Sequence, residues 1–293
     1  FSYIGTGTWS GAGVLKNSLT FESTSVVTVS GIVNYNTGTL TAVAGCSVTT
    51  TGSTLTMAAS TTLNTNTINW NKITISAAST ITNNSALSID GLLTISGSGT
   101  NVINGSDVTC KGGYTASAGR NMTGTAKIIF GGTGSQGISL GNIASITNNI
   151  DFNTSGTITF TTNNFYYGGG TLKYISGTVV SSTAALYIIS SCTLDLNGTT
   201  WDSGSVTATS TITVNSLLTI TGNVALTSFN ITYIGSAGWV FGGITMTTGD
   251  HILKSGNTYL ITTNLTAVGT AAANGSFTSS VGGVQAILTL QQG

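Results

Sequence analysis

Apolar and polar residues alternate with a period of two along most of the chain. The alternation is clearest at Val26–Val29, Ser53–Met57, Thr157–Phe160, Thr193–Leu196 and Ser210–Val214. Successive side chains of a β-strand point to opposite faces, so this period predicts strands with one buried and one outward face. Short clusters of Gly, Asn and Ser separate the runs and are typical of turns. No window of about 11 residues shows the 3.6-residue apolar period of a helix, and we therefore expect little or no helix.

Internal repetition is the second strong signal. The segment around Trp70 aligns without gaps with the segment around Trp201, and the two tryptophans match in this alignment. Shorter echoes also occur, such as the similar segments that begin at Gly124 and Gly170, 46 residues apart. A spacing near 45 fits either two stacked coils of about 20–25 residues or one wider coil. Repetition of strand-forming segments favours an architecture in which each repeat stacks on the next.

These patterns predict an all-β, parallel β-solenoid (β-helix-like) repeat architecture. Val, Ile and Leu would fill its interior, and Thr, Ser and Asn would coat its exterior. A β-propeller with blades of about 45 residues is a weaker alternative, because closed rings tolerate unequal repeats less well than solenoids do. A string of β-sandwiches is a third. We expect residues 1–267 to form the solenoid repeats, and residues 268–293 to form a loop and a terminal strand leading to a further module.

The charge content narrows the set of partners. Charged residues make up 5% of the chain and 40% is hydrophobic, whereas about 25% of an ordinary soluble domain is charged. Seven basic and seven acidic residues balance, so no net field attracts nucleic acid, anionic lipid or an acidic substrate. No run approaches the ~20 apolar residues of a spanning helix. The sequence therefore predicts neither a nucleic-acid nor a membrane partner.

Metal and cofactor chemistry has few candidate residues. Cys46, Cys110 and Cys192 are too few and too scattered for a disulfide framework or a thiolate metal site. His251 is the only histidine, which excludes a cluster of histidine ligands. We expect no metal site and no cofactor.

A pair of carboxylates is the one catalytic arrangement that the sequence suggests. Asp151 and Asp195 occupy matching places in two similar segments, 44 residues apart. Two coils of separation would place them about 10 Å apart, near the upper limit for inverting glycosidases. Each Asp, however, lies between two large apolar residues, so we expect it to point outward without a catalytic role. The sequence thus predicts no catalytic residue.

Two surface features suggest binding. Phe165, Tyr166 and Tyr167 are consecutive and cannot all face one interior, so we predict a receptor or subunit contact there. Thr-x-Thr pairs such as Thr54-Leu-Thr56 and Thr211-Ile-Thr213 resemble the ladders of ice-binding solenoids. An ice face needs such pairs in register on successive coils, and their irregular spacing argues against it.

Two longer segments carry a resemblance to known proteins. Residues Gly124–Asn142 and Ser79–Gly99 resemble the low-charge repeats of bacterial secreted adhesins and of phage tail-fibre or tailspike shafts. The resemblance implies a right-handed parallel β-solenoid, or a related fibrous fold, that works in attachment outside a cell. It transfers no site residues.

The expected function is a structural or adhesive, non-enzymatic fibre component of a virion, such as a phage tail fibre or appendage. A bacterial cell-surface adhesin or extracellular filament subunit is one alternative, and a polysaccharide-degrading tailspike is another. The expected partners are further copies of the chain, other fibre subunits, or a cell-surface glycan receptor. The expected location is extracellular, on a virion or cell surface.

Overall fold

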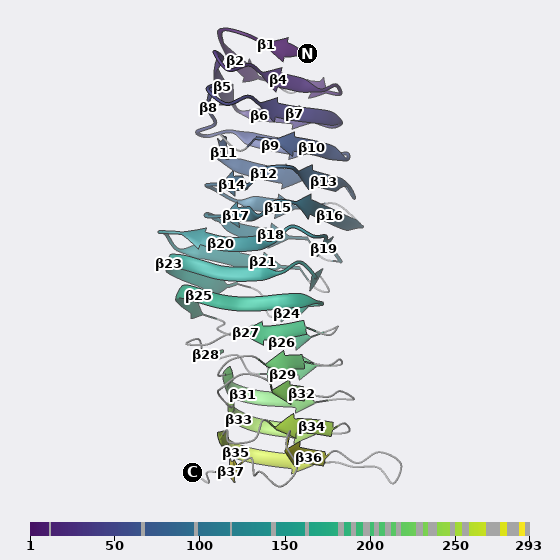
Figure 1. Ribbon diagram of the computed structural model, residues 1–293, viewed down its shortest axis with the longest axis vertical. Coiled ribbons are helices and arrows are strands. Elements are labelled where there is room, and N and C mark those ends of the chain that lie inside the picture. Colours follow the sequence, from purple (N-terminus) through teal and green to yellow (C-terminus); the bar gives the residue numbers. More distant parts are fainter. Residues whose placement is uncertain are drawn as a thin grey trace. The chain divides into compact units, whose positions relative to one another are not determined.

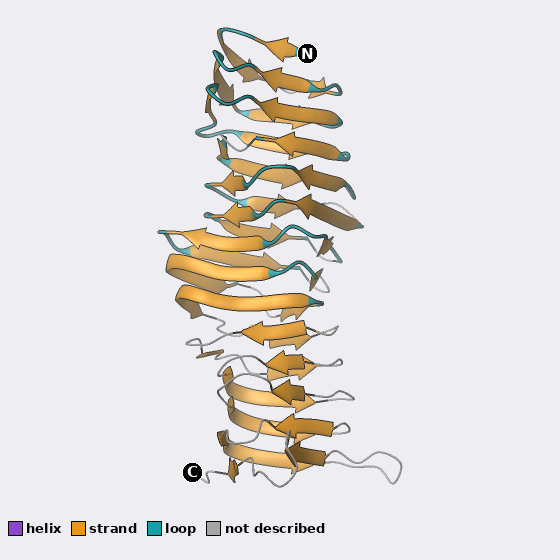
Figure 2. Ribbon diagram, in the orientation of Figure 1, coloured by secondary structure: helices purple, strands orange, loops and turns teal. Residues whose placement is uncertain are grey.

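The described part of the chain is all-β, and its parallel sheets form a β-solenoid with about eight turns in the first 160 residues. The computed structural model describes residues 1–180 except 12, 66–67, 97–98, 118, 142–144 and 162–163, and after them the strands from β26 (Ala185–Ile188) to β37 (Ile287–Leu290). This described part contains strands and loops but no helix (Figure 2), and accordingly no helix there could span a membrane. The predicted fold class is confirmed.

Two compact units make up the chain. The N-terminal unit comprises Phe1–Asn148 and Asn153–Ile158, and the C-terminal unit comprises Asn149–Phe152 and Thr159–Gly293. Strand β23 (Ile150–Phe160) contributes residues to both.

Each of the first seven coils of the N-terminal unit contributes one strand to each of three faces (Figure 1). The first face contains β1 (Ser2–Tyr3), β4 (Leu19–Phe21), β7 (Gly38–Ala42), β10 (Thr61–Asn64), β13 (Thr80–Asn83), β16 (Thr100–Gly105), β19 (Asn121–Thr123) and β22 (Ser145–Ile146). The second contains β2 (Thr6–Ser10), β5 (Val26–Ser30), β8 (Ser47–Thr49), β11 (Asn69–Trp70), β14 (Leu87–Ile89), β17 (Val108–Cys110) and β20 (Ile128–Gly132). The third contains β3 (Val14–Leu15), β6 (Ile32–Tyr35), β9 (Thr54–Met57), β12 (Lys72–Ile75), β15 (Leu93–Ile95), β18 (Gly113–Ala116) and β21 (Gln136–Leu140).

The pairing register gives the length of a coil. On the first face, Ser2 of β1 pairs with Thr20 of β4, and Asn121 of β19 pairs with Ser145 of β22. Both pairings are parallel, so each pair marks one full circuit of the chain. A circuit therefore takes about 20 residues, as in stacked-repeat proteins with short repeats. Of the two coil lengths that the sequence allows, the shorter one is confirmed.

Inward side chains of successive coils form continuous columns. On the third face, pairing stacks Leu55, Ile73, Leu93, Tyr114 and Ile138 one above another, and none is more than 2% exposed. Burying such a side chain contributes about 1.5–3 kcal/mol. The alternation read from the sequence thus becomes an apolar interior, as in stacked-repeat proteins generally.

Buried polar side chains connect neighbouring coils through hydrogen bonds to backbone carbonyl oxygens. The Asn148 side-chain amide donates to the carbonyl oxygen of Ala126 at 2.8 Å, which lies in the preceding coil. The buried guanidinium of Arg120, the only arginine of the chain, donates to the carbonyl oxygens of Gly99, at 2.9 Å, and of Ser96. Burial lowers the pKa of this guanidinium. Buried polar groups need such partners, because an unmade hydrogen bond inside a protein is costly.

The C-terminal unit is built on two parallel ladders. One contains β24 (Asn164–Tyr167), β26, β29 (Ser205–Ala208), β31 (Leu218–Leu226), β33 (Trp239–Met246), β35 (Thr258–Ala267) and β37, and β28 (Thr200–Trp201) also pairs with β31. The other contains β25 (Gly170–Val180), β27 (Cys192–Asp195), β30 (Ile212–Val214), β32 (Ile231–Tyr233), β34 (Asp250–Leu253) and β36 (Ser276–Ser279).

The last described strand pairs within the chain. In β37, Ile287 lies opposite Thr258 of β35 in a parallel pairing. The terminal strand expected near the end of the sequence therefore joins the same ladder as the strands before it. The predicted loop falls mostly outside the described residues, and the boundary between residues 267 and 268 and the further module remain predictions.

Candidate functional site

The predicted aromatic contact lies in β24. Phe165 and Tyr167 are fully buried and Tyr166 is half-buried, which confirms that the three side chains do not share one face. The Phe165 ring lies 4.9 Å from that of Phe160 and stacks at 6.3 Å on Tyr167. Phe165 and Tyr167 are therefore core residues, and of the three only Tyr166 presents surface. A receptor or subunit contact through it remains a prediction.

Asp151 lies in a buried stretch and not at the surface. It is 8% exposed, between the fully buried side chains of Ile150 and Phe152. Asp151 is therefore covered, and the alternation of buried and exposed residues fails at the start of β23, where all three residues are buried. The predicted outward direction of its side chain remains a prediction. Burial raises the pKa of Tyr167, and the charges of Cys192 and Asp151 raise it further.

The second member of the suspected carboxylate pair is placed only by its backbone. Asp195 lies opposite Lys173 in the pairing of β27 with β25, and its side chain lies outside the described residues, as do those of His251 and Trp201. Asp151 is thus the only one of the two carboxylates whose exposure is defined, and it is covered.

The described residues include no group of three or more His, Cys, Asp and Glu side chains that could hold a metal ion. No disulfide joins the three cysteines. Burial raises the pKa of the Cys110 and Cys192 thiols to about 12. At neutral pH both therefore carry a proton, which makes them poor nucleophiles.

Hydroxyl side chains form a row along the third face. Its members pair coil by coil: Thr56, Thr74, Thr94, Thr115 and Ser139. In the C-terminal unit, the threonine positions 171, 193, 213 and 232 pair in the same way. Single hydroxyl positions therefore stay in register although the repeats differ in length, because the extra residues lie in the turns.

A double row of threonines does not form on the third face. Thr54 lies opposite Ile32 in one neighbouring strand and Lys72 in the other. The Thr54-Leu-Thr56 pair is therefore not repeated on the adjacent coils, and the two-row array of an ice face is missing there.

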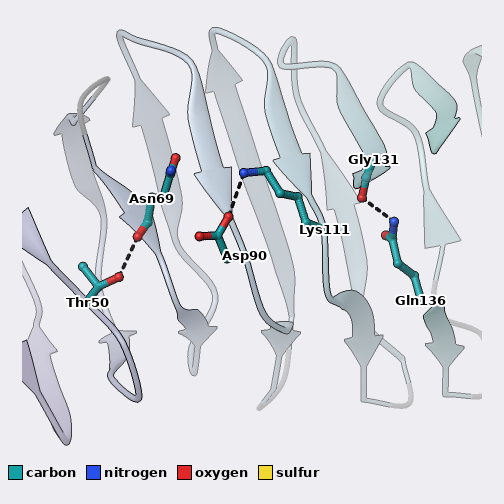
Figure 3. Close-up of polar contacts among 6 residues, drawn as sticks. All are labelled: Thr50, Asn69, Asp90, Lys111, Gly131 and Gln136. Carbon is teal, nitrogen blue, oxygen red and sulfur yellow. Dashed lines mark hydrogen bonds and ion pairs between the residues drawn. The ribbon is translucent and has the colours of Figure 1, made fainter. Parts of the chain in front are cut away.

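An open polar groove lies on the second face, and we call it the Asp90 groove. Its volume is about 280 Å³, and it is lined by Val48, Thr49, Thr50, Thr51, Asn69, Asn71 and Asp90. The Thr50 hydroxyl donates to the carbonyl oxygen of Asn69 at 2.6 Å, and Lys111 donates to the Asp90 carboxylate at 2.7 Å. Figure 3 shows these two contacts on neighbouring coils, followed by the bond from Gln136 to Gly131.

Sequence reasoning missed this groove. Three consecutive threonines, Thr49–Thr51, and a rare acidic residue, Asp90, were its only signals. They lie far apart in the sequence, and only the stacking of coils brings them together.

No family model matches the chain, and comparisons with curated proteins and with solved structures find no match either.

Proposed function

We propose that the chain is a structural and adhesive part of an extracellular fibre, such as a phage tail fibre or another virion appendage, and that it has no enzymatic activity. The observation that supports this most strongly is the combination of a continuous apolar column with an outward row of hydroxyls along the same face. A stack of coils extends by adding further coils without changing the interior, which suits a shaft.

The sparse charge suits an exposed surface of this kind. With 5% charged residues and no net charge, the surface offers little long-range attraction to other macromolecules. Parallel ladders also pair most strands with a neighbouring coil on each side. Such backbone bonds resist the local opening that proteases need.

The coverage of Asp151 favours the non-enzymatic role over a polysaccharide-degrading spike. A glycoside hydrolase needs two carboxyl groups that reach the sugar from opposite sides. Asp151 is only 8% exposed, so a polymer in solution has little access to it. The partners we propose are further copies of the chain or other fibre subunits, with a cell-surface glycan as receptor.

Immunogold electron microscopy tests the proposal. Antibodies against the purified chain are applied to particles and to cells from the source culture. We expect labelled fibres on particles. Label confined to the cell envelope would support the alternative of a bacterial surface adhesin. Label confined to the cytoplasm, or cleavage of a surface polysaccharide by the purified chain, would contradict the proposal.

A further inference from the structure

Among the described residues, the backbone ladder of the second face is interrupted between β8 and β11. Strand β8 is the last strand of a three-stranded sheet with β2 and β5, whereas β11 begins a separate ladder with β14. The strands shorten toward this point, from five residues in β5 to three in β8 and two in β11. The Asp90 groove lies at this interruption, since Val48 and Thr49 of β8 and Asn69 of β11 all line it.

An interrupted ladder leaves strand edges that a ligand can use. Within the described residues, Thr50 bridges the gap with its side-chain hydroxyl, which donates to the carbonyl oxygen of Asn69. Elsewhere on this face the neighbouring coils pair through their backbones, as Asn69 and Trp70 do with Ser88 and Ile89. The groove therefore presents strand edges as well as polar side chains, and both can hydrogen-bond a bound molecule.

The lining residues are suited to hydroxyl groups. Thr49, Thr51, Asn69 and Asp90 are exposed. Threonine hydroxyls and asparagine amides both donate and accept hydrogen bonds, whereas an ionised carboxylate accepts only. A sugar ring carries several neighbouring hydroxyls that also donate and accept, so it can satisfy all three kinds of group.

Lys111 makes a cation an unsuitable ligand. Its ammonium lies 2.7 Å from the Asp90 carboxylate, across the coil boundary. The pair is neutral overall, and it holds the only carboxylate that lines the groove. Calcium sites use six to eight oxygen ligands and usually several carboxylates, whereas a neutral polyol gains from one fixed acceptor. The volume of about 280 Å³ lies just below the range of about 300–1,000 Å³ for pockets of drug-sized ligands, which fits a single sugar unit.

We propose that the Asp90 groove binds a neutral sugar unit of a cell-surface glycan. This inference rests on the proposed surface role and names the site and the ligand class that an adhesive function would use. Asp90 accepts from sugar hydroxyls, Asn69 and Asn71 donate and accept through their amides, and Thr49 and Thr51 complete the polar wall.

The test uses the full chain on an array of neutral and acidic glycans, followed by titration calorimetry with a retained neutral oligosaccharide. Asp90→Ala should weaken binding by at least about tenfold, because it removes a charged hydrogen-bond acceptor. Thr49→Val, which keeps the shape and removes the hydroxyl, should weaken it by about threefold or more. Asp107→Ala is the matched control. It removes an exposed carboxylate at the next coil, outside the groove, and should leave affinity unchanged.

Three results would overturn the inference: no retained neutral glycan, equal affinity of the Asp90→Ala chain, or calcium binding that Asp90→Ala abolishes while neutral glycans fail to bind. Circular dichroism of each variant separates loss of the site from loss of the fold. If particles are labelled by the antibody but no neutral glycan binds, the inference fails and the proposed function stands. If glycan binding is confirmed but the label is only cytoplasmic, the proposed function fails and the site stands.

Discussion

The two units build their coils from different numbers of strands. In the N-terminal unit each of the first seven coils carries three short strands, whereas the described C-terminal unit has two ladders with strands as long as the 11 residues of β25. One circuit nevertheless takes a similar length of chain in both. It runs from Asn121 to Ser145 in the first unit and from Ser205 to Asn223 in the second. Pairing register, and not the number of strands, therefore defines a coil.

The described interiors also differ in side-chain type. Aliphatic residues dominate the column of the N-terminal unit, for example Leu55, Ile73 and Leu93. In the C-terminal unit, Phe152 meets Phe160 edge-on at 6.0 Å, and Phe160 meets Phe165 at 4.9 Å. Such aromatic pairs contribute about 0.5–1.5 kcal/mol beyond the area they bury.

The largest effect is expected from a charge inside the N-terminal column. Ile73→Asp should lower the free energy of unfolding by more than about 4 kcal/mol, because it buries an unpaired carboxylate. Urea unfolding measures this loss, and hydrogen exchange shows which strands open. The neighbouring Thr74→Asp, which faces outward, should cost less than about 1 kcal/mol. Similar losses for both variants would contradict the assigned inward and outward faces.

Matched truncations compare the two interiors directly. Ile138 in β21 and Leu172 in β25 are both fully buried, so Ile138→Ala and Leu172→Ala should each cost about 2–5 kcal/mol. Chemical denaturation of the two variants measures the costs. A loss below about 1 kcal/mol for either residue would show that its column is not packed as described.

Alkaline pH should destabilise both units. Burial raises the thiol pKa of Cys110 and Cys192 from 9.0 to about 12. Above pH 9 the unfolded thiols lose protons that the folded ones keep, so stability is complete below pH 9 and falls until about pH 12. At pH 10 each thiol should cost on the order of 1 kcal/mol.

Denaturation curves at pH 8 and pH 10 measure this difference. The double variant Cys110→Val and Cys192→Val should reduce the loss of stability, and buried Tyr114 and Tyr167, whose pKa burial also raises, should account for part of the remainder. An identical loss in the parent and the double variant would contradict burial of the thiols.

The smallest effect is expected at the Asp90–Lys111 pair. Its side chains are 49% and 36% exposed, and exposed ion pairs contribute about 0–1 kcal/mol. Asp90→Ala and Lys111→Ala should therefore change the free energy of unfolding by less than about 1 kcal/mol in urea titrations. A loss above about 2 kcal/mol, beyond what an exposed pair contributes, would show that the pair is a structural element of the coil.

Local patterns predicted the fold class and the inward positions, but not what depends on pairing between distant residues. Leu55 and Met57 alternate with Thr54 and Thr56, and that alternation gave the correct faces. The spacing between two similar segments left the coil length open, because that spacing fits either two short coils or one wide coil. The low exposure of Asp151 could not be predicted, because neighbours from other strands decide its burial. The Asp90 groove could not be predicted from local patterns, because Lys111, which pairs with the Asp90 carboxylate, lies 21 residues away in the sequence. The groove also depends on the end of the backbone ladder of the second face, which no local pattern shows.

Distances between spin labels test the stacking of coils most directly. With Cys46 replaced by Ser, labels at Thr56 and Ser139 lie four pairing steps apart on the third face. Each step is about 4.8 Å, so pulsed electron paramagnetic resonance should give about 19 Å, broadened by the label arms, although the two positions are distant in the sequence. A distance of about 35 Å or more, well beyond four strand spacings, would contradict the parallel stack.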